Sequence, residues 1–201
     1  LHDPSGLARV FATPFDAVVH FAAFSLVGES VRDPLRYWEN NVGGTLALLD
    51  RVARGGARRF VFSSTAAVYG EPGVDPIPET APPDPVNPYG HTKLAMEYAL
   101  ADVARAHDVA AVALRYFNAA GATANLGEDH DPETHLIPRL LHSVLRPEAD
   151  FAVFGDDYPT PDGTCVRDYI HVADLAEAHA LALEWVDRPG FTALNLGTGA
   201  G

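Results

Sequence analysis

Three side chains near the middle of the sequence combine a hydroxyl, a phenol and an ammonium group: Thr65, Tyr89 and Lys93. Tyr89 and Lys93 are four residues apart in a segment with helical character, so their side chains should lie a turn apart on one face. Tyrosine has a pKa near ~10 and is a poor base at neutral pH, but a neighbouring ammonium group favours the phenolate. The pair can then take a proton from a sugar or alcohol hydroxyl that Thr65 hydrogen-bonds. By spacing alone, an ordinary pair on a helix surface is the more frequent explanation.

The elements predicted around these residues alternate between strands and helices. Buried strands are predicted where apolar residues run without alternation, at 16–21, 59–63, 110–115 and 193–196. Helices are predicted from their periodic apolar residues at 5–12, 35–54, 88–107, 134–146 and 173–186. We therefore expect an α/β fold with a doubly wound parallel sheet. Ligands of such sheets bind beyond the carboxyl ends of the strands, where Thr65 follows the strand at 59–63.

The remaining segments are predicted to be less regular. Residues 30–36 are polar and interrupted by proline. The connection at 71–88 is a long loop, whose acidic part 71–85 is expected to be a solvated lid or rim. A short strand is predicted at 151–154, followed by a loop over 155–168. In the helix at 88–107, the residues Leu94, Tyr98, Leu100 and Val103 are candidates for the core.

Composition excludes several classes of function. The 201 residues have a formal net charge of -13, which argues against binding to nucleic acid or to an anionic membrane. A single cysteine, Cys165, excludes an internal disulfide framework and fits a reducing compartment such as the cytoplasm. No apolar run is long enough to span a membrane. The only methionine is Met96, so we expect these residues to be an internal part of a longer protein.

Several sequence blocks resemble one enzyme family. Thr65-Ala-Ala-Val-Tyr-Gly70, Pro88-Tyr-Gly-His-Thr-Lys93, Arg115-Tyr-Phe-Asn118 and Arg167-Asp-Tyr-Ile-His-Val172 together resemble the extended short-chain dehydrogenase/reductases. Within that family the chain is similar to the UDP-glucose 4-epimerases. This closer likeness rests on the blocks Tyr158–Val172, His20–Ala23, Val27–Val31, Asn40–Val42 and His135–Pro138. The resemblance covers nearly the whole chain in consistent order.

The resemblance implies a Rossmann-like sheet, incomplete in these residues, and the start of a smaller substrate-binding lobe. Residues 1–121 would belong to an NAD-binding domain that lacks its first βαβ unit. Residues 122–172 would be a segment of the substrate-binding lobe, and residues 173–201 the return to the first domain.

The resemblance also implies an NAD-dependent isomerase of galactose metabolism that interconverts UDP-glucose and UDP-galactose. In this family NAD takes hydride from C4 of a UDP-hexose, the 4-keto sugar turns over, and hydride returns to its other face. Tyr89 would be the base, and Lys93 would lower its pKa and bind the nicotinamide ribose. Thr65 would occupy the Ser/Thr position that hydrogen-bonds the substrate.

The family's binding positions also have counterparts in this chain. Cofactor positions correspond to Phe21, Ala22, Ala23, Ser25, Asn40, Ser63, Tyr89, Lys93 and Phe117, with Ser25 standing where the family has a lysine. Positions that hold the UDP-sugar correspond to Thr65, Asn118, His135, Leu136, Ala152, Phe154 and Arg167. The family also implies a homodimer, formed through the helices at 35–54 and 88–107.

Three of these residues have alternative explanations. The Arg167 guanidinium suits a diphosphate, but it could instead form a surface salt bridge with Asp168. Asn118 could bind a phosphate or a sugar, or cap a loop. His130 and His135 might be thought to bind a metal, yet no cluster has the spacing of metal ligands, so we expect none.

The chain departs from the family at the cofactor's phosphate site. It has no Gly-rich phosphate loop and no acidic ribose ligand, so we expect residues 1–201 alone to hold NAD poorly. One alternative function is another NAD-dependent nucleotide-sugar enzyme, either a decarboxylase or a 4,6-dehydratase. A dehydratase needs Asp-Glu after the threonine, and Ala66 and Ala67 supply neither an acid nor a base. A second alternative is a non-catalytic truncated fragment.

Overall fold

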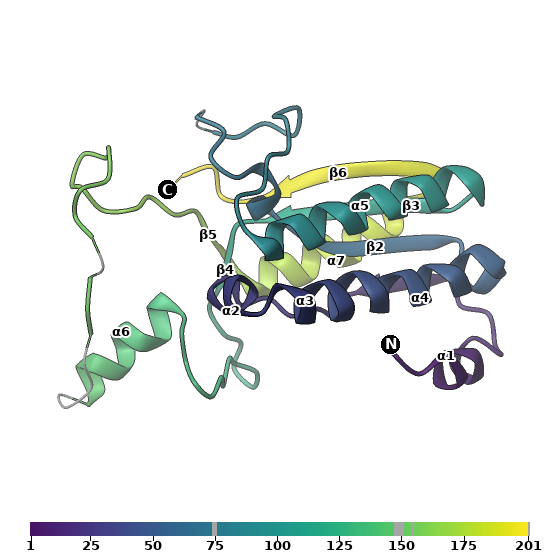
Figure 1. The fold of residues 1–201 in the computed structure, drawn as a ribbon, viewed down its shortest axis with the longest axis horizontal. Coiled ribbons are helices and arrows are strands. Elements are labelled where there is room, and N and C mark those ends of the chain that lie inside the picture. The colour runs from purple at the N-terminus through teal and green to yellow at the C-terminus, as the bar shows by residue number, and fades with distance from the viewer. Residues whose placement is uncertain (74–75, 147–150, 154, 201) are drawn as a thin grey trace.

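A computed structural model describes residues 1–73, 76–146, 151–153 and 155–200. Its centre is a sheet in the order β1-β2-β3-β6, in which every neighbouring pair is parallel (Figure 1). The strands are β1 (Ala17–His20), β2 (Arg59–Thr65), β3 (Ala110–Tyr116) and β6 (Gly190–Leu196). The four predicted strands are confirmed. Thr65 is the last residue of β2 rather than the start of the following loop.

The helix predicted at 35–54 is a continuous helical segment with four parts. These are α3 (Pro34–Tyr37), the π-helical η1 (Trp38–Gly43), α4 (Gly44–Arg51) and the π-helical η2 (Val52–Gly56). Its start is capped by the Asp33 side chain, with Pro34 in the first turn. Its end is set by Gly55, whose φ of 90° lies in the left-handed region that favours glycine.

Helices cover both faces of the sheet, as a doubly wound fold requires. On one face, α4 and α5 (Pro88–Ala106) enclose the larger core with strands β2 and β3. The buried members of this core include Leu49, Val52, Phe60, Phe62, Met96, Leu100, Ala111 and Ala113. On the other face, α7 (Val172–Trp185) and the residue after it pack Ala182 and Val186 against Val61 and Val112.

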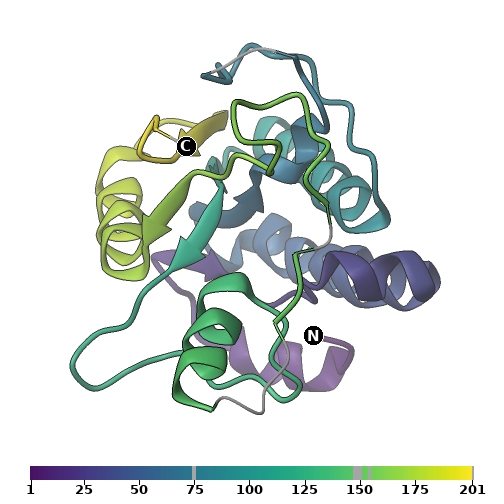
Figure 2. The same ribbon diagram turned by 90° about the vertical axis from the view of Figure 1, so that its left-hand side faces the viewer.

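A second, smaller group of elements lies beyond the carboxyl ends of the main strands. There β4 (Asn118–Ala120) and β5 (Tyr169–His171) form a parallel pair, seen side by side in Figure 2. These strands were not predicted, because three residues give no readable periodicity. The helix predicted at 134–146 is α6 (Leu136–Leu145), and none of its residues is buried. In Figure 1 it lies apart from the sheet, on the side toward which β6 points.

Several local predictions were wrong. Residues 151–153 are irregular rather than a strand, and Phe154 lies outside the described residues. The segment expected to be irregular at 30–36 is largely helical, in α2 (Val27–Arg32) and α3. A 3-10 turn, η3 (Ala66–Tyr69), follows β2, and α1 (Pro4–Val10) begins the chain. Tyr98, predicted to be in the core, is 60% exposed because it lies on the outer face of α5.

The helices were also examined for length and apolar character. Among the described residues, none of them is both long enough and apolar enough to cross a bilayer.

Truncation of a side chain on α5 should therefore depend strongly on its face. We expect Leu100→Ala to lower the free energy of unfolding of the complete protein by about 2–5 kcal/mol, because it leaves a cavity in the larger core. Tyr98→Ala should change it by less than about 1 kcal/mol, because Tyr98 is exposed. Urea unfolding of both variants measures the difference, and equal losses would contradict this arrangement of the helix.

Candidate active site

The amino end of α5 carries Tyr89 and is fixed at its first turn. The Asn87 side chain caps the helix by accepting a hydrogen bond from the Gly90 amide at 2.9 Å, and Pro88 occupies the first helical position. The Tyr89 amide donates to the Ser30 hydroxyl of α2 at 3.2 Å. The start of the helix therefore has a defined position beside the carboxyl end of β2.

Lys93 is buried between α5 and β2. Its Nζ donates to the Ser63 carbonyl at 2.6 Å and lies 4.9 Å from the centre of the Phe62 ring. The side chain also reaches the Tyr89 ring, whose centre is 5.9 Å from Nζ. The same-face arrangement predicted from the four-residue spacing is thus confirmed, but the pair is buried rather than on the helix surface.

Burial dominates the ionisation of this pair. It lowers the pKa of Lys93 to about 7, an effect that the negative charge of Glu97 opposes. It raises the pKa of Tyr89 to about 12, which the nearby Thr65 hydroxyl opposes and Tyr116 reinforces. The expected lowering of the tyrosine pKa by Lys93 does not arise from the chain's own groups. At neutral pH a lysine with a pKa near 7 is only partly charged, so its influence on the phenol is weak.

Thr65 stands at the junction between β2 and the turn that follows it. Its Oγ1 accepts a hydrogen bond from the Ala67 amide at 3.1 Å and so caps η3. This contact uses an acceptor site of the hydroxyl and leaves its proton available for the Tyr89 phenol or a substrate oxygen. The structure therefore brings the three predicted catalytic residues together at the carboxyl end of β2.

One turn beyond Lys93 on α5, a buried ion pair joins the helix to the sheet. Both carboxylate oxygens of Glu97 accept from Arg115 on β3, Oε1 from Nε at 2.9 Å and Oε2 from Nη2 at 2.5 Å. Ser64 of β2 donates its hydroxyl to the same carboxylate at 2.5 Å. Both side chains are almost fully buried, so Glu97 has no solvent to compensate the loss of either partner.

The ion pair continues into the loop after η3 and the end of β6. Arg115 Nη1 donates to the Tyr69 hydroxyl at 2.8 Å, which donates to Asn195 Oδ1 at 2.7 Å. Asn195 in turn donates its side-chain amide to the Ile77 carbonyl and its backbone amide to the Glu79 carboxylate. The loop predicted to be a solvated lid or rim is thus attached to the sheet at residues 77–79.

The predicted cofactor positions near β1 form the segment that leaves this strand. Phe21 is exposed, with its ring 4.6 Å from that of His179 on α7, and Ala22 and Ser25 are also exposed. Asn41 holds the segment by accepting from the Phe24 amide at 2.8 Å and donating to its carbonyl at 3.0 Å. Asn41 also donates to Thr92, next to Lys93, so the segment and α5 share one anchor.

The other predicted cofactor positions are distributed around this anchor. The side-chain amide of Asn40 donates to Asn41 Oδ1 at 3.0 Å. Ala23 is partly buried and directly precedes Phe24, the residue that Asn41 holds. The Ser63 hydroxyl is hydrogen-bonded to the Tyr116 phenol. Phe117 lies against Gly197, since a Cβ built at that glycine would come within 3.0 Å of its ring.

Two predicted substrate positions lie on the second sheet. The Asn118 side-chain amide donates to the Asp168 carbonyl at 2.9 Å, which connects β4 to the residue before β5. The alternative salt bridge between Arg167 and Asp168 is not formed. Instead the Asp168 carboxylate accepts from the amides of Thr198 and Gly199 at 2.9 Å, while exposed Arg167 contacts the Val166 carbonyl.

Of the remaining predicted substrate positions, those that the structure describes form no hydrogen bond with the catalytic residues. His135 occupies the N-cap position of α6, Leu136 begins that helix, and both are exposed. Ala152 lies in the irregular segment after α6, and Phe154 is outside the described residues. His135 and Leu136 belong to the group of elements beyond the carboxyl ends of the strands, where ligands of parallel sheets bind.

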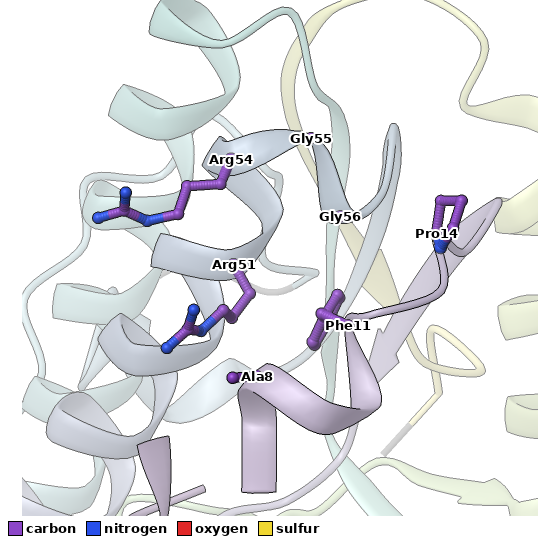
Figure 3. A pocket seen from close by; sticks show the side chains of 7 residues that line it. All are labelled: Ala8, Phe11, Pro14, Arg51, Arg54, Gly55 and Gly56. Carbon is purple, nitrogen blue, oxygen red and sulfur yellow. The ribbon is translucent and has the colours of Figure 1, made fainter. Parts of the chain in front are cut away.

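Two hollows in the described residues lie away from this site. One of about 270 Å³ is lined by α1 and the end of the helix at 34–56, as Figure 3 shows, and includes Arg51, Arg54 and Phe11. A second is lined by the start of β6 and the end of α7. Both are at the amino ends of the strands and contain no tyrosine, lysine or carboxylate arrangement like that of α5. The chemistry of the side chains, rather than the depth of a hollow, therefore identifies the candidate site.

Comparison with known proteins identifies the family of the chain. Residues 1–197 match the model of the NAD-dependent epimerase/dehydratase family. The chain belongs to this family. It is 55% identical over 205 residues to the UDP-glucose 4-epimerase of Streptomyces lividans and 54% identical over 187 residues to that of Corynebacterium glutamicum. These matches cover 100% and 93% of this chain, but only 61% and 57% of the relatives.

Solved structures of the family have the same fold. The UDP-glucose 4-epimerase of Brucella ovis in complex with NAD superposes with a TM-score of 0.92 at 52% identity. That of Bifidobacterium longum, in complex with NAD+ and UDP, gives 0.93 at 43% identity. Each match covers 99% of this chain and 63% or 61% of the other. The epimerase/dehydratase family thus confirms the Rossmann-like α/β fold, and the chain spans about three fifths of the relatives' length.

Sequence reasoning missed several residues that organise the site. Glu97 continues the i, i+4 series from Tyr89 and Lys93, so its place on the same face was readable, but its partner Arg115 was not. Asn41 stood inside a quoted motif without an assigned role, and Asp168 was considered only as the alternative salt-bridge partner of Arg167. A charged or amide residue among buried apolar neighbours was the available signal, because such groups are buried only with partners.

The ion pair predicts a large effect of removing one partner. Glu97→Gln should lower the free energy of unfolding of the complete protein by about 3–5 kcal/mol, because Arg115 would remain buried without its carboxylate. Chemical denaturation measures the change. The double variant Glu97→Leu with Arg115→Met should recover most of the loss, and a loss below about 1 kcal/mol for Glu97→Gln would contradict the pairing.

The low pKa of Lys93 predicts a pH dependence of stability. Its folded value of about 7 lies below its ordinary value of 10.5, so between these pH values the unfolded chain binds more protons. The free energy of unfolding should therefore rise with pH across this window relative to Lys93→Met. Unfolding of both proteins without added cofactor between pH 7 and pH 10 measures this difference, and a constant difference would show that Lys93 titrates normally.

Proposed function

We propose that the complete protein is an NAD-dependent UDP-glucose 4-epimerase. The observation that carries this proposal is the convergence of Thr65, Tyr89 and Lys93 at the buried end of β2. Relatives that are 50–55% identical to the chain are UDP-glucose 4-epimerases, and the matched structures include complexes with NAD and UDP. Because the chain spans about 61% of such a relative, the activity is assigned to the complete protein.

In this proposal Tyr89 moves the proton at the sugar's O4. As a phenolate it accepts the proton when C4 is oxidised and returns it when C4 is reduced on the other face. Thr65 donates a hydrogen bond to O4 and orients it toward the phenol. Since burial raises the pKa of Tyr89 to about 12, the phenolate needs positive charge from Lys93 and from a bound ligand.

The residues around Lys93 fit the nicotinamide half of NAD. Lys93 has one acceptor among the described residues, the Ser63 carbonyl, although its ammonium carries three donors, so two remain for ribose hydroxyls. Phe21 directly follows β1 and has an exposed ring. The segment after it is hydrogen-bonded to the Asn41 side chain through the Phe24 amide. When bound, NAD supplies the hydride acceptor and donor for C4.

The UDP-sugar is proposed to bind against the second sheet and α6. Exposed Arg167 can place paired donors on a diphosphate, and Asn118 lies beside it across the β4–β5 pair. His135, Leu136, Ala152 and Phe154 complete this side on the strength of the family resemblance. The division into a cofactor domain and a substrate lobe at 121/122 and 172/173 remains part of the proposal.

The alternatives are less well supported. A 4,6-dehydratase would need an acid and a base after Thr65, yet η3 begins with Ala66 and Ala67. A decarboxylase of the same family would use the same Tyr89 and Lys93 arrangement. However, the relatives at 54–55% identity to this chain are UDP-glucose 4-epimerases. A non-catalytic role would not explain why Lys93 is buried, because burying an ammonium group lowers the stability of the fold.

A homodimer is proposed through the two helices that cover one face of the sheet. Leu35, Trp38 and Leu46 are exposed along the helix at 34–56, next to α5. Leu35 is 78% exposed, which is unusual for a large apolar residue beside other such residues. The single cysteine continues to favour a reducing compartment, the cytoplasm.

The decisive experiment measures conversion of UDP-galactose to UDP-glucose by the complete protein. We expect Tyr89→Phe to lower kcat by about 10²–10⁴-fold, because the proton transfer loses its base. Tyr98→Phe is the matched control, a tyrosine of the same helix whose side chain is exposed, and should retain activity. If the complete protein binds NAD but does not convert UDP-galactose, the epimerase assignment is wrong, and dehydratase substrates would be tested next.

A further inference from the structure

The loop between β4 and α6 gathers four side chains that could hold a metal ion: Glu128, His130, Glu133 and His135. One ring nitrogen or carboxylate oxygen from each lies within 4.8 Å of all the others. From the sequence we considered His130 and His135 but expected no metal, because no cluster has the spacing of metal ligands. The folding of the loop creates the cluster.

The two imidazoles turn the same ring nitrogen toward the carboxylates. Glu128 Oε1 lies 2.5 Å from His135 Nδ1 and 3.0 Å from His130 Nδ1. Glu133 Oε1 lies 2.9 Å from His135 Nδ1, and the two imidazole rings are 5.0 Å apart. All four groups therefore converge on one point rather than forming two separate pairs.

The local backbone holds one of these carboxylates in place. Glu133 Oε1 accepts from the backbone amides of Thr134 and His135, each at 2.6 Å. The carboxylate is therefore pre-oriented at the start of α6.

Protonation and metal binding would use the same atoms of the cluster. Three contacts join an imidazole Nδ1 to a carboxylate oxygen, and one proton on each Nδ1, with that of His135 shared between two carboxylates, accounts for all three. A divalent cation would replace these two protons, balance the two carboxylates and contact all four ligand atoms at once.

We propose that Glu128, His130, Glu133 and His135 bind one Zn²⁺ ion. Imidazole nitrogens and carboxylate oxygens are ordinary zinc ligands, and four protein ligands are typical of a structural rather than a catalytic zinc. A tetrahedral zinc with bonds near 2.0–2.1 Å separates its ligand atoms by roughly 3.3 Å. The separations here, from 2.5 Å up to 4.8 Å, bracket that value.

The ion would fasten the acidic loop to the first residues of α6. His135 is both a ligand and a predicted substrate residue, and Leu136 follows it directly. The zinc would therefore order the part of the substrate lobe that bears these two residues. This effect on substrate rests on the proposed function, whereas the site itself does not.

Metal content of the complete protein tests the site. After treatment with a chelator, the protein is titrated with Co²⁺ and then Zn²⁺, with visible absorption and mass spectrometry of the bound metal as readouts. We expect one Co²⁺ per chain, with the intense absorption of four-coordinate cobalt, displaced by one equivalent of Zn²⁺. Absence of a stoichiometric ion would overturn the proposal.

Variants of the loop locate the ion. Losing even a neighbour of a metal ligand costs 10–100-fold in affinity, so His130→Asn with Glu133→Gln should weaken Co²⁺ binding by about 100-fold or more. His142→Asn, an exposed histidine of α6 outside the cluster, should bind as the unmodified protein does. Unchanged binding by the double variant would place the ion elsewhere and refute the site.

Activity on the same samples separates the two proposals. Removal of zinc should raise KM for UDP-galactose more than it lowers kcat, because the ordered segment contacts substrate and not the reacting atoms. A protein that binds one zinc but does not convert UDP-galactose would refute the epimerase function and leave the site intact. An active protein without zinc would do the reverse.

Discussion

The buried ion pair between Glu97 and Arg115 is the interaction on which the arrangement of the site depends. It joins α5 to β3 through two hydrogen bonds and to β2 through Ser64. A carboxylate and a guanidinium buried together are stable only if their geometry is maintained, since either charge alone would be costly. The pair therefore fixes the rotation of α5, and with it the direction in which Lys93 and Tyr89 point.

The same pair has an electrostatic role one helical turn away. Burial lowers the pKa of Lys93 to about 7, so the lysine is only partly charged at neutral pH, while Glu97 raises this pKa and opposes the loss of charge. Arg115 neutralises most of the carboxylate, so the compensation is only partial. Because the pKa of Tyr89 is raised to about 12, formation of the phenolate needs additional positive charge, which suits a reaction driven by the binding of a cationic ligand.

Much of the fold could be predicted from the sequence, because the main strands are long apolar runs and the main helices are clearly periodic. The Tyr89 and Lys93 pair was also readable, since four residues on a helix define one face. Short strands such as β4 and β5 could not be predicted, because their pairing depends on contacts fifty residues apart. The partners of Glu97 and Asp168 were hidden for the same reason. The direction of the Tyr89 pKa shift depended on burial, which no local pattern encodes.

The side of the molecule that we propose to bind substrate differs from the side that we propose to bind the cofactor. Lys93, Glu97 and Arg115 are buried, whereas Arg167 is exposed and no residue of α6 is buried. Asp168, just before β5, connects this side to the end of β6 by accepting from Thr198 and Gly199. In the proposed reaction a buried reaction centre would act beside an exposed substrate side, which suits a sugar that must turn over between two hydride transfers.

The position of β1 has a practical consequence for the chain in isolation. It lies at the edge of the four-stranded sheet and pairs only with β2, and its residues Ala17, Val18, Val19 and His20 include no charged side chain at neutral pH. Natural sheets usually protect such an edge with a charge, a proline or a bulge, because unpaired backbone groups recruit another strand. Within the described residues no second strand pairs with it. At the concentrations used for crystallisation or NMR, these 201 residues are therefore prone to associate strand to strand, and their colloidal behaviour will be governed by this four-residue edge.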